Sequence, residues 1–268
     1  ENKMVQSVEE VMDILDLCYQ HGWDERNGGN LSLMVDEKDI KPLLGEGKVL
    51  RSYTDEECDF TNIIGRYFII TGTGKYFKNV KKDPEMNLGI LRVKDKTTVE
   101  LLWGLKDGGG PTSETPTHLL CHIERLKVDP NHRLVLHCHA TNVIAMTFVL
   151  PVDSNRFTEE LWKIQTESIV VFPEGVAELP WMMCGGAEIG KATAALMKEY
   201  RTVIWAQHGI FCTGRDLDET YGLLETIEKA AEIYMKVCDK RVYQTIKNDE
   251  LKEIARCFNL NYRKGIID

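Results

Sequence analysis

Residues 133–139 have the sequence Arg-Leu-Val-Leu-His-Cys-His, an apolar run that ends in two histidines. Aliphatic and β-branched residues in such a run predict a buried strand. Successive side chains of a strand point to opposite faces, so His137 and His139 should project together while Cys138 points away. Two imidazoles on one face are a ready pair of metal ligands, although two partly buried histidines bonded to carbonyl groups would give the same pattern.

His208 adds a third imidazole to this pair. It follows a buried strand predicted over residues 202–206 and precedes Gly209. A polar residue at the end of a strand, beside a flexible glycine, is a common position for a functional site. Three histidine ligands would leave an open coordination position on Zn²⁺, which is typical of a catalytic site. His118 and His122 lie four residues apart on a predicted helix, a spacing that could also bind metal. No HExxH glutamate lies between them, so we expect them to pack in the interior instead.

Glu114 lies in the segment Pro-Thr-Ser-Glu-Thr-Pro of residues 111–116, at the start of a helix predicted over residues 114–126 with Ser113 as its cap. The helix dipole stabilises a carboxylate in this position. Glu114 is therefore either a simple helix-start residue or, if the fold brings it to the metal, a general base. The residues alone leave both interpretations open.

Three further segments combine glycines with small polar residues: 27–30 (Asn-Gly-Gly-Asn), 71–75 (Thr-Gly-Thr-Gly-Lys) and 112–113 (Thr-Ser). Their backbone N–H groups, amides and hydroxyls could hold a phosphate without many basic residues. Each alone is typical of an ordinary turn, and residues 71–75 lack the spacing of a Walker A loop. Together with a metal site, they indicate a small phosphorylated substrate.

Composition excludes several classes of function. The 268 residues are 43% hydrophobic and 28% charged, as in ordinary globular proteins. The net charge of −9 disfavours a nucleic-acid partner. The longest apolar run is well short of the roughly 20 residues that span a bilayer, and no signal peptide is visible, so we expect no membrane partner. Eight cysteines without a CxxC pair indicate reduced thiols and a cytoplasmic location.

Hydrophobic periodicity predicts an irregular alternation of helices and strands. The first helix should begin at a capping box at Ser7 and end near Gly22. Several short strands in succession indicate a mixed or antiparallel sheet covered by helices. Without a linker or repeat, residues 1–268 are expected to form one domain, in which 36–62 is an irregular insertion or flap. The predicted strands are 31–35, 66–71, 88–93, 98–103, 133–139, 168–172 and 202–206, and the later helices are 114–126, 140–148, 186–200, 216–238 and 249–258.

In chain order, these motifs resemble the family of class II, zinc-dependent sugar-phosphate aldolases, which includes the adducin head domain. The resemblance covers nearly the whole chain and is weakest at residues 36–62. It implies a three-layer α/β/α fold with a central, mostly antiparallel sheet, and a homotetramer with active sites near subunit boundaries. The stretches that carry it are residues 22–31 (Gly-Trp-Asp-Glu-Arg-Asn-Gly-Gly-Asn-Leu), 111–114, 135–142, 170–173 and 217–220.

The resemblance also implies roles for individual residues. His137, His139 and His208 would bind one Zn²⁺ per subunit, and Glu114 would be the base. Glu167 would be a second carboxylate that acts from a neighbouring subunit, unless it is only a solvated residue at the rim. Gly29 would lie against the substrate, and the residues expected to hold its phosphate are Asn27, Asn30, Thr73, Thr112 and Ser113.

Within the family, residues 22–27 and the chain length favour L-rhamnulose 1-phosphate as substrate. The implied reaction, a step of L-rhamnose breakdown, is retro-aldol cleavage to dihydroxyacetone phosphate and L-lactaldehyde. Zinc would stabilise the enediolate charge and Glu114 would move the proton.

Three alternatives to this reading stay open. One is an aldolase or epimerase acting on fuculose 1-phosphate or ribulose 5-phosphate. A remote one is a non-catalytic, adducin-like interaction module, which would lack the three histidines. A purely structural zinc site would need a fourth ligand, for which Cys212 is a weak candidate.

Overall fold

A nine-stranded sheet runs through the computed structural model of the protein, which describes residues 4–268. Its strand order is β2-β5-β4-β3-β1-β6-β9-β8-β7. Neighbouring strands are antiparallel except for β7 and β8, which are parallel. All nine strands belong to this one sheet, and the single domain expected from the sequence stays a prediction. The strands are β1 (Asn30–Val35), β2 (Arg51–Thr54), β3 (Tyr67–Thr71), β4 (Leu88–Val93), β5 (Thr98–Gly104), β6 (Leu134–Cys138), β7 (Ala177–Leu179), β8 (Thr202–Trp205) and β9 (Gly209–Gly214).

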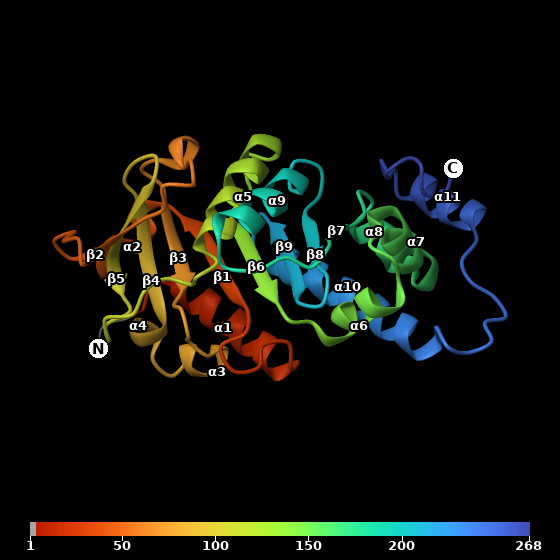
Figure 1. Ribbon diagram of the computed structural model, residues 1–268, viewed down its shortest axis with the longest axis horizontal. Coiled ribbons are helices and arrows are strands. Elements are labelled where there is room, and N and C mark those ends of the chain that lie inside the picture. Colours follow the sequence, from red (N-terminus) through yellow and green to blue (C-terminus); the bar gives the residue numbers. More distant parts are fainter. Residues whose placement is uncertain (1–3) are drawn as a thin grey trace.

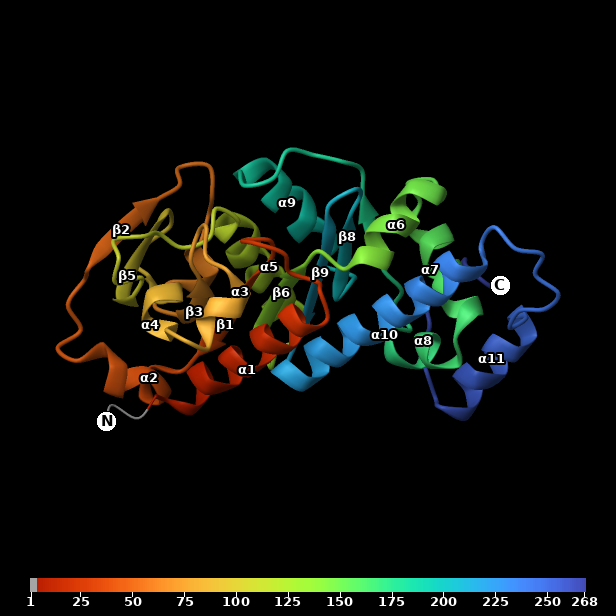
Figure 2. The same cartoon turned by 90° about the horizontal axis from the view of Figure 1, so that it is seen from below.

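Helices cover both faces of this sheet, as Figures 1 and 2 show, so the predicted fold class is confirmed. Helices α5 and α9 pack together on one face, and α1 and α10 cross the other. Helices α6, α7, α8 and α11 gather at the end of the molecule beyond β7. The helices are α1 (Gln6–Gln20), α2 (Glu37–Leu44), α3 (Phe77–Val80), α4 (Pro84–Asn87), α5 (Thr115–Val128), α6 (Thr141–Val149), α7 (Ser154–Ile164), α8 (Thr166–Val171), α9 (Ala187–Leu196), α10 (Leu217–Val237) and α11 (Asn248–Cys257), with a 3₁₀ turn at Thr61–Ile63.

The hydrophobic core is divided by the sheet. On the α1 and α10 side, Leu15 and Ile227 belong to the same buried cluster as Leu136 of β6. On the opposite side, Leu119 of α5 packs in a cluster with Phe68 of β3. Burying one such side chain stabilises the fold by about 1.5–3 kcal/mol, so the two clusters hold both helix layers against the strands.

The strand predicted over residues 168–172 is wrong, because residues 168–171 belong to the helix α8, which ends at Val171. The segment packs against α7, α10 and α11, and its buried side is formed by Ser168 and Ile169. Tertiary packing therefore overrides the β preference of branched side chains. The sequence analysis also missed α7, whose first turn is capped by Asp153, and the strands β7 and β9.

Residues 36–62 are more regular than the predicted flap. They contain α2, the edge strand β2 and the 3₁₀ turn. The guanidinium of Arg51 donates hydrogen bonds to the carbonyl oxygens of Leu105 and Gly109, at 2.7 and 2.8 Å, and these bonds tie β2 to the loop after β5. Strand pairing and these bonds fix the segment to the sheet edge.

Two predicted helix caps are wrong. Helix α1 begins one residue before Ser7, whose buried hydroxyl has no hydrogen-bond partner in the described residues. Helix α5 begins after Glu114, and Ser113 does not cap it. All eight cysteines are free thiols, as expected. Within residues 4–268, no helix is both long and apolar enough to cross a membrane.

Helix α10 has a side-chain cap that can be tested. Asp216 Oδ1 accepts a hydrogen bond of 2.8 Å from the backbone N–H of Glu219. We expect Asp216→Ala to lower the free energy of unfolding by about 1 kcal/mol in denaturant titrations, because one N–H of the first turn loses its acceptor. The matched change Asp218→Ala, in the same turn but not at the cap, should cost less than about 0.5 kcal/mol. Equal losses would contradict this role for Asp216.

Candidate active site and metal centre

Three histidines meet at one end of the central strands. Strand β6 lies between β1 and β9, and His137 is paired with Asn30 on one side and Phe211 on the other. His139 follows β6 directly, and His208 lies in the turn between β8 and β9. Nitrogen atoms of the three histidines lie within 4.8 Å of one another, a separation that suits coordination of one ion.

Hydrogen bonds fix the tautomers of two of these rings. His137 Nδ1 donates to the carbonyl oxygen of Ile210 at 3.1 Å, and His139 Nδ1 lies 3.0 Å from Glu25 Oε1, to which it donates. The second nitrogen of each neutral ring, Nε2, then carries a lone pair. His137 Nε2 is buried and has no hydrogen-bond partner among the described residues. An unpaired buried lone pair is costly, and a metal ion would satisfy it.

Burial also keeps two of the rings, His137 and His208, neutral. It lowers the pKa of His137 well below its usual value, and the neighbouring histidines add to the effect. The pKa of His208 falls to about 4 for the same two reasons. Neutral imidazole is the form that binds metals. These two rings are therefore ready for a cation at neutral pH.

Glu114 faces this cluster from the start of α5. Its two carboxylate oxygens lie 3.6 Å from His137 Nε2 and 3.9 Å from His208 Nε2. Burial raises its pKa, which the hydrogen bond from Asn30 partly offsets. That bond, from Asn30 Nδ2 to Glu114 Oε2, is 2.6 Å long. The position and environment of Glu114 suit a group that exchanges a proton beside a metal.

Gly29 has a backbone conformation and surroundings that require glycine. Its φ is +78°, and a Cβ atom would lie 1.9 Å from Asp24 Oδ2. Asp24 is itself buried, beside Cys18 and Cys138 on the side away from the histidines, as predicted for Cys138. The loop can therefore pass close to β6 and expose backbone groups to the pocket.

One pocket contains ten of the eleven site residues that the sequence analysis names. The phosphate-binding candidates, the three histidines and Glu114 all line it, although they come from five separate segments. Asn30, Thr112 and Glu114 are buried, whereas Asn27, Thr73 and Ser113 are exposed at its mouth. The lining residues are Glu25, Arg26, Asn27, Gly28, Gly29, Asn30, Gly72, Thr73, Gly74, Thr112, Ser113, Glu114, Cys184, His137, His139 and His208.

Glu167 is the site candidate that the structure does not bring to this pocket. It is exposed on α8 and does not line the pocket of its own chain. Cys212 is buried on β9 next to Thr202 and does not join the histidine cluster. The cysteine near His208 and Glu114 is Cys184, which the sequence analysis did not consider.

The sequence analysis also missed two charged residues that line this pocket. Arg26 supplies the cation among the lining residues and has a positive φ of 52°. Glu25 accepts the hydrogen bond that orients His139. Both lie in the Asp-Glu-Arg-Asn run that precedes the two glycines, so their place beside a candidate phosphate loop was the available signal.

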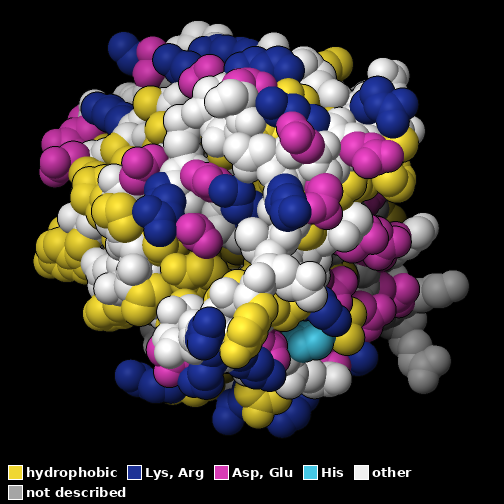
Figure 3. Space-filling model, turned by 90° about the vertical axis from the view of Figure 1, so that its right-hand side faces the viewer, with side chains coloured by type: hydrophobic (Ala, Val, Ile, Leu, Met, Phe, Trp, Pro, Cys, Tyr) yellow, Lys and Arg dark blue, Asp and Glu magenta, His cyan; other side chains and the backbone are white. Residues whose placement is uncertain are grey.

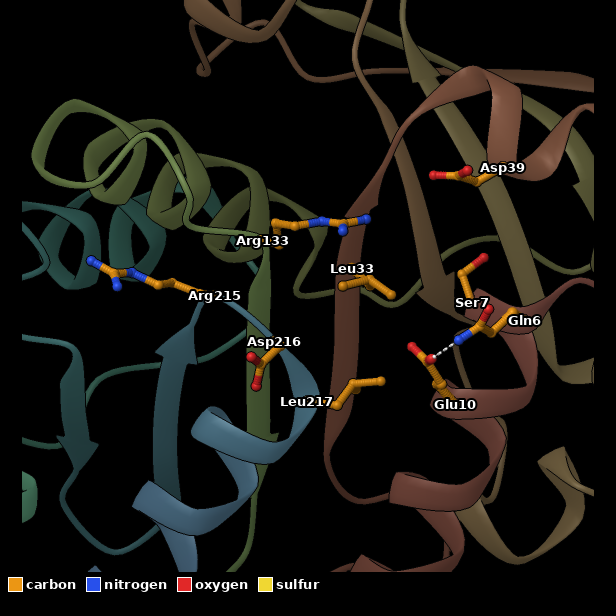
Figure 4. A pocket seen from close by; sticks show the side chains of 9 residues that line it. All are labelled: Gln6, Ser7, Glu10, Leu33, Asp39, Arg133, Arg215, Asp216 and Leu217. Carbon is orange, nitrogen blue, oxygen red and sulfur yellow. Dashed lines mark hydrogen bonds between the residues drawn. The ribbon is translucent and has the colours of Figure 1, made fainter.

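A second pocket lies on another part of the surface, between α1, β1 and the turn before α10 (Figure 4). Glu10, Asp39, Arg133 and Arg215 place charges of both signs around it, and Gln6 donates a hydrogen bond to Glu10. Within residues 4–268, none of the groups of metal-ligating side chains lies there. The histidine pocket is therefore the stronger candidate for chemistry.

Comparisons with known proteins agree with this assignment. The family described as Class II Aldolase and Adducin N-terminal domain matches residues 9–235. A rhamnulose-1-phosphate aldolase of Enterococcus faecalis is 49% identical over 97% of this chain and 94% of its own length. The corresponding protein of Klebsiella pneumoniae is 45% identical over 92% of this chain and 91% of its own.

Two solved structures with a similar fold are also aldolases. The crystal structure of a sugar-phosphate aldolase from Thermotoga maritima superimposes with a TM-score of 0.74 at 27% identity, and covers 88% of this chain and 97% of that one. An L-fuculose 1-phosphate aldolase at 16% identity shares the fold with a TM-score of 0.62. The family match over most of the sequence, together with these relatives, shows that the chain belongs to the class II aldolase and adducin family.

Proposed function

We propose that the protein cleaves L-rhamnulose 1-phosphate to dihydroxyacetone phosphate and L-lactaldehyde, in L-rhamnose breakdown. One observation carries this proposal: the carboxylate of Glu114 faces three clustered histidines in a pocket lined by three phosphate-binding candidate loops. Relatives that match nearly the whole chain are named for cleavage of this substrate. The eight free thiols support a cytoplasmic location.

His137, His139 and His208 would hold one Zn²⁺ per subunit. Their chemistry fits this ion, because each ring is either neutral or oriented so that one nitrogen keeps a lone pair. In addition, His137 Nε2 has no other partner in the described structure. Three histidines leave the open position that a catalytic ion requires. When bound, such an ion supplies Lewis-acid stabilisation of the negative charge that develops as the carbon–carbon bond breaks.

Glu114 would be the residue that moves the proton. As the C3–C4 bond breaks, the C4 hydroxyl loses its proton and becomes the aldehyde, and the electron pair of the bond stays on the three-carbon fragment. C3 of that fragment must then gain a proton. Oε2 of Glu114 is occupied by the amide of Asn30, so Oε1 is the oxygen available for transfer. Its buried position beside the histidines keeps water from competing as the proton donor.

The loops at the mouth of the pocket would hold the phosphate. Gly29 and Gly74 both have positive φ, so their loops turn sharply and expose N–H groups. The hydroxyls of Thr73 and Ser113 and the guanidinium of Arg26 line the same region. Fixing the phosphate at one end of the pocket orients the reacting carbons at the other.

Two alternative functions differ in what they require of these residues. A fuculose 1-phosphate aldolase or a ribulose 5-phosphate epimerase would need the same ion and base, and pocket shape would decide between them. An adducin-like interaction module would not need three histidines and a glutamate in one pocket, and their convergence favours an enzyme.

The proposal includes a homotetramer in which Glu167 acts on the pocket of a neighbouring subunit. Glu167 is exposed on α8 and absent from its own pocket, so it is free to face another chain. Hydrophobic groups also gather on the face shown in Figure 3. Exposed apolar side chains are typical of surfaces that pack against other subunits. Over the whole described structure they include Phe148, Val149, Val152, Trp181, Met183, Tyr243 and Phe258.

The substrate and the metal can be tested in one assay. We expect rapid release of dihydroxyacetone phosphate from L-rhamnulose 1-phosphate, and slower release from L-fuculose 1-phosphate. A strong chelator should abolish the activity, and Zn²⁺ should restore it, because the charge on the breaking bond then loses and regains its stabilisation. Cleavage that survives complete removal of metal would overturn the metal role. Faster cleavage of L-fuculose 1-phosphate would overturn the substrate.

Replacing Glu114 should separate metal binding from catalysis. We expect Glu114→Gln to bind Zn²⁺ in the same amount as the unchanged protein but to lose about 10²–10⁴-fold in kcat, because an amide cannot take up the proton. Metal content is measured by atomic emission, and kcat by the release of dihydroxyacetone phosphate. The change Cys184→Ser, in the same pocket, is the matched control and should retain activity. A Glu114→Gln protein with full turnover would remove Glu114 from the mechanism.

Mixing two inactive variants can test whether Glu167 acts between subunits. We expect Glu114→Gln and Glu167→Gln proteins each to be impaired. After joint unfolding and reassembly at equal amounts, roughly a quarter of the sites in random homotetramers should combine an intact Glu114 with an intact Glu167 from the neighbour. Activity should therefore recover to about that fraction. No recovery in verified mixed tetramers would indicate that Glu167 acts within its own chain or not at all.

A further inference from the structure

A line of buried polar side chains leads from Glu114 into the interior between β1 and α5. Helix spacing places Glu114, His118 and His122 along one side of α5, each four residues after the last. Strand alternation places Asn30 and Ser32 on one face of β1. None is more than 6% exposed, and the line, in order from Glu114, is Asn30, His118, Ser32, His122 and His132.

Each neighbouring pair in this line is within hydrogen-bond distance. Asn30 Nδ2 contacts Glu114, and Asn30 Oδ1 contacts His118 Nε2. The Oγ atom of Ser32 lies 2.6 Å from His118 Nδ1 and 2.8 Å from His122 Nε2. The line ends with a contact of 2.8 Å between His122 Nδ1 and His132 Nε2. The line therefore alternates between β1 and α5 as far as His122 and ends at His132, in the connection that follows α5.

The carboxylate sets the direction of the first two bonds. Asn30 Nδ2 donates to Glu114 Oε2, so it is the amino group of the amide that faces the carboxylate. The carbonyl oxygen of Asn30 then faces His118 and can only accept. His118 Nε2 must therefore carry the hydrogen.

Neutral rings carry the same direction onward. Burial lowers the pKa values of His118 and His132 to about 3 and that of His122 well below its usual value, so each ring has one N–H. His118 Nδ1 thus accepts from the Ser32 hydroxyl, which has no second hydrogen. Ser32 in turn accepts from His122 Nε2, and His122 Nδ1 accepts from His132. Every donor in the line points toward Glu114.

We propose that this one-directional chain of hydrogen bonds fixes the Asn30 amide, and through it Glu114, with His118 as the principal positioning residue. His118 holds the carbonyl oxygen of Asn30 away from Glu114, so the amino group alone faces the carboxylate. A rotated amide would place two oxygen atoms against each other. The importance of this orientation for turnover rests on the proposed role of Glu114 as the base, whereas the direction of the chain does not.

The arrangement has a further consequence for ligand recognition. Asn30 lines the pocket, and its carbonyl oxygen is already occupied by His118. Its amino group has two hydrogens, and Glu114 takes one of them. The second N–H can therefore bind an acceptor on a ligand, such as a phosphate or hydroxyl oxygen.

Neutron diffraction from crystals of the unchanged protein in D₂O tests the chain directly. We expect a deuteron on Nε2, and none on Nδ1, in His118, His122 and His132, because each hydrogen position follows from the one before. A deuteron on Nδ1 of His118, or rings that carry two deuterons, would overturn the proposal. This outcome does not depend on what Glu114 does, so it separates failure of the chain from failure of the proposed function.

Two variants of His118 test its effect on turnover. In His118→Gln the side-chain amide can still donate to Asn30 from nearly the same position as Nε2, whereas His118→Phe keeps the ring shape and loses the donor. We expect kcat to fall about 10- to 100-fold in His118→Phe and only a few-fold in His118→Gln, with KM changing less than kcat. Thr117→Val, a buried neighbour on α5 whose hydroxyl has no partner in the described structure, is the matched control and should retain kcat.

Proton transfer can be measured apart from bond cleavage. With dihydroxyacetone phosphate alone in D₂O, the exchange of its carbon-bound hydrogen should slow in His118→Phe in parallel with kcat, while zinc content and Tm of His118→Gln stay close to those of the unchanged protein. Equal kcat and exchange rates in His118→Phe and the unchanged protein would contradict the positioning role. If Glu114→Gln retained full exchange while the deuterons lay on Nε2, the role of Glu114 would fail and the chain would stand.

Discussion

The pairing of β6 with β1 and β9 is the constraint on which the site depends. It places His137 beside Asn30 on one side and Phe211 on the other, so the histidine pair, the Gly-Gly-Asn loop and the turn with His208 meet at one end of the sheet. A slip of one residue would turn His137 and His139 to the opposite face. The metal cluster therefore exists only in this register.

The same end of the sheet concentrates buried polar groups, which are costly unless they are paired. The structure pairs almost all of them: His137 with a carbonyl group, His139 with Glu25, and Glu114 with Asn30. Among the described residues, the exceptions at this end are His137 Nε2, which faces the cluster, and the two carboxylate oxygens of Asp24 on the other side of β6. The lone pair of His137 Nε2, which faces the other two imidazoles, is prepared for a ligand that the chain itself does not supply.

Much of this arrangement was predictable from local patterns. The alternation of residues 133–139 indicated a strand with both imidazoles on one face, and the glycine-rich loops indicated a phosphate site. The resemblance to class II aldolases ordered these motifs into one pocket. By contrast, the strand predicted at residues 168–172 is the helix α8, because its neighbours α7, α10 and α11 bury one side of it. The edge strand β2 was also missed, because its place depends on pairing with β5 and on Arg51.

The sequence by itself determined which chemical groups are present and the local spacing that makes them useful: His-x-His on a strand, glutamate at a helix start and glycines where φ is positive. It did not determine that Glu114, Asn30, His118, Ser32, His122 and His132 form one hydrogen-bonded line. His118 and His122 were expected only to pack in the interior. Only the tertiary structure decided that line, because hydrogen bonds between β1 and α5 depend on how a strand and a helix more than eighty residues apart are laid against each other.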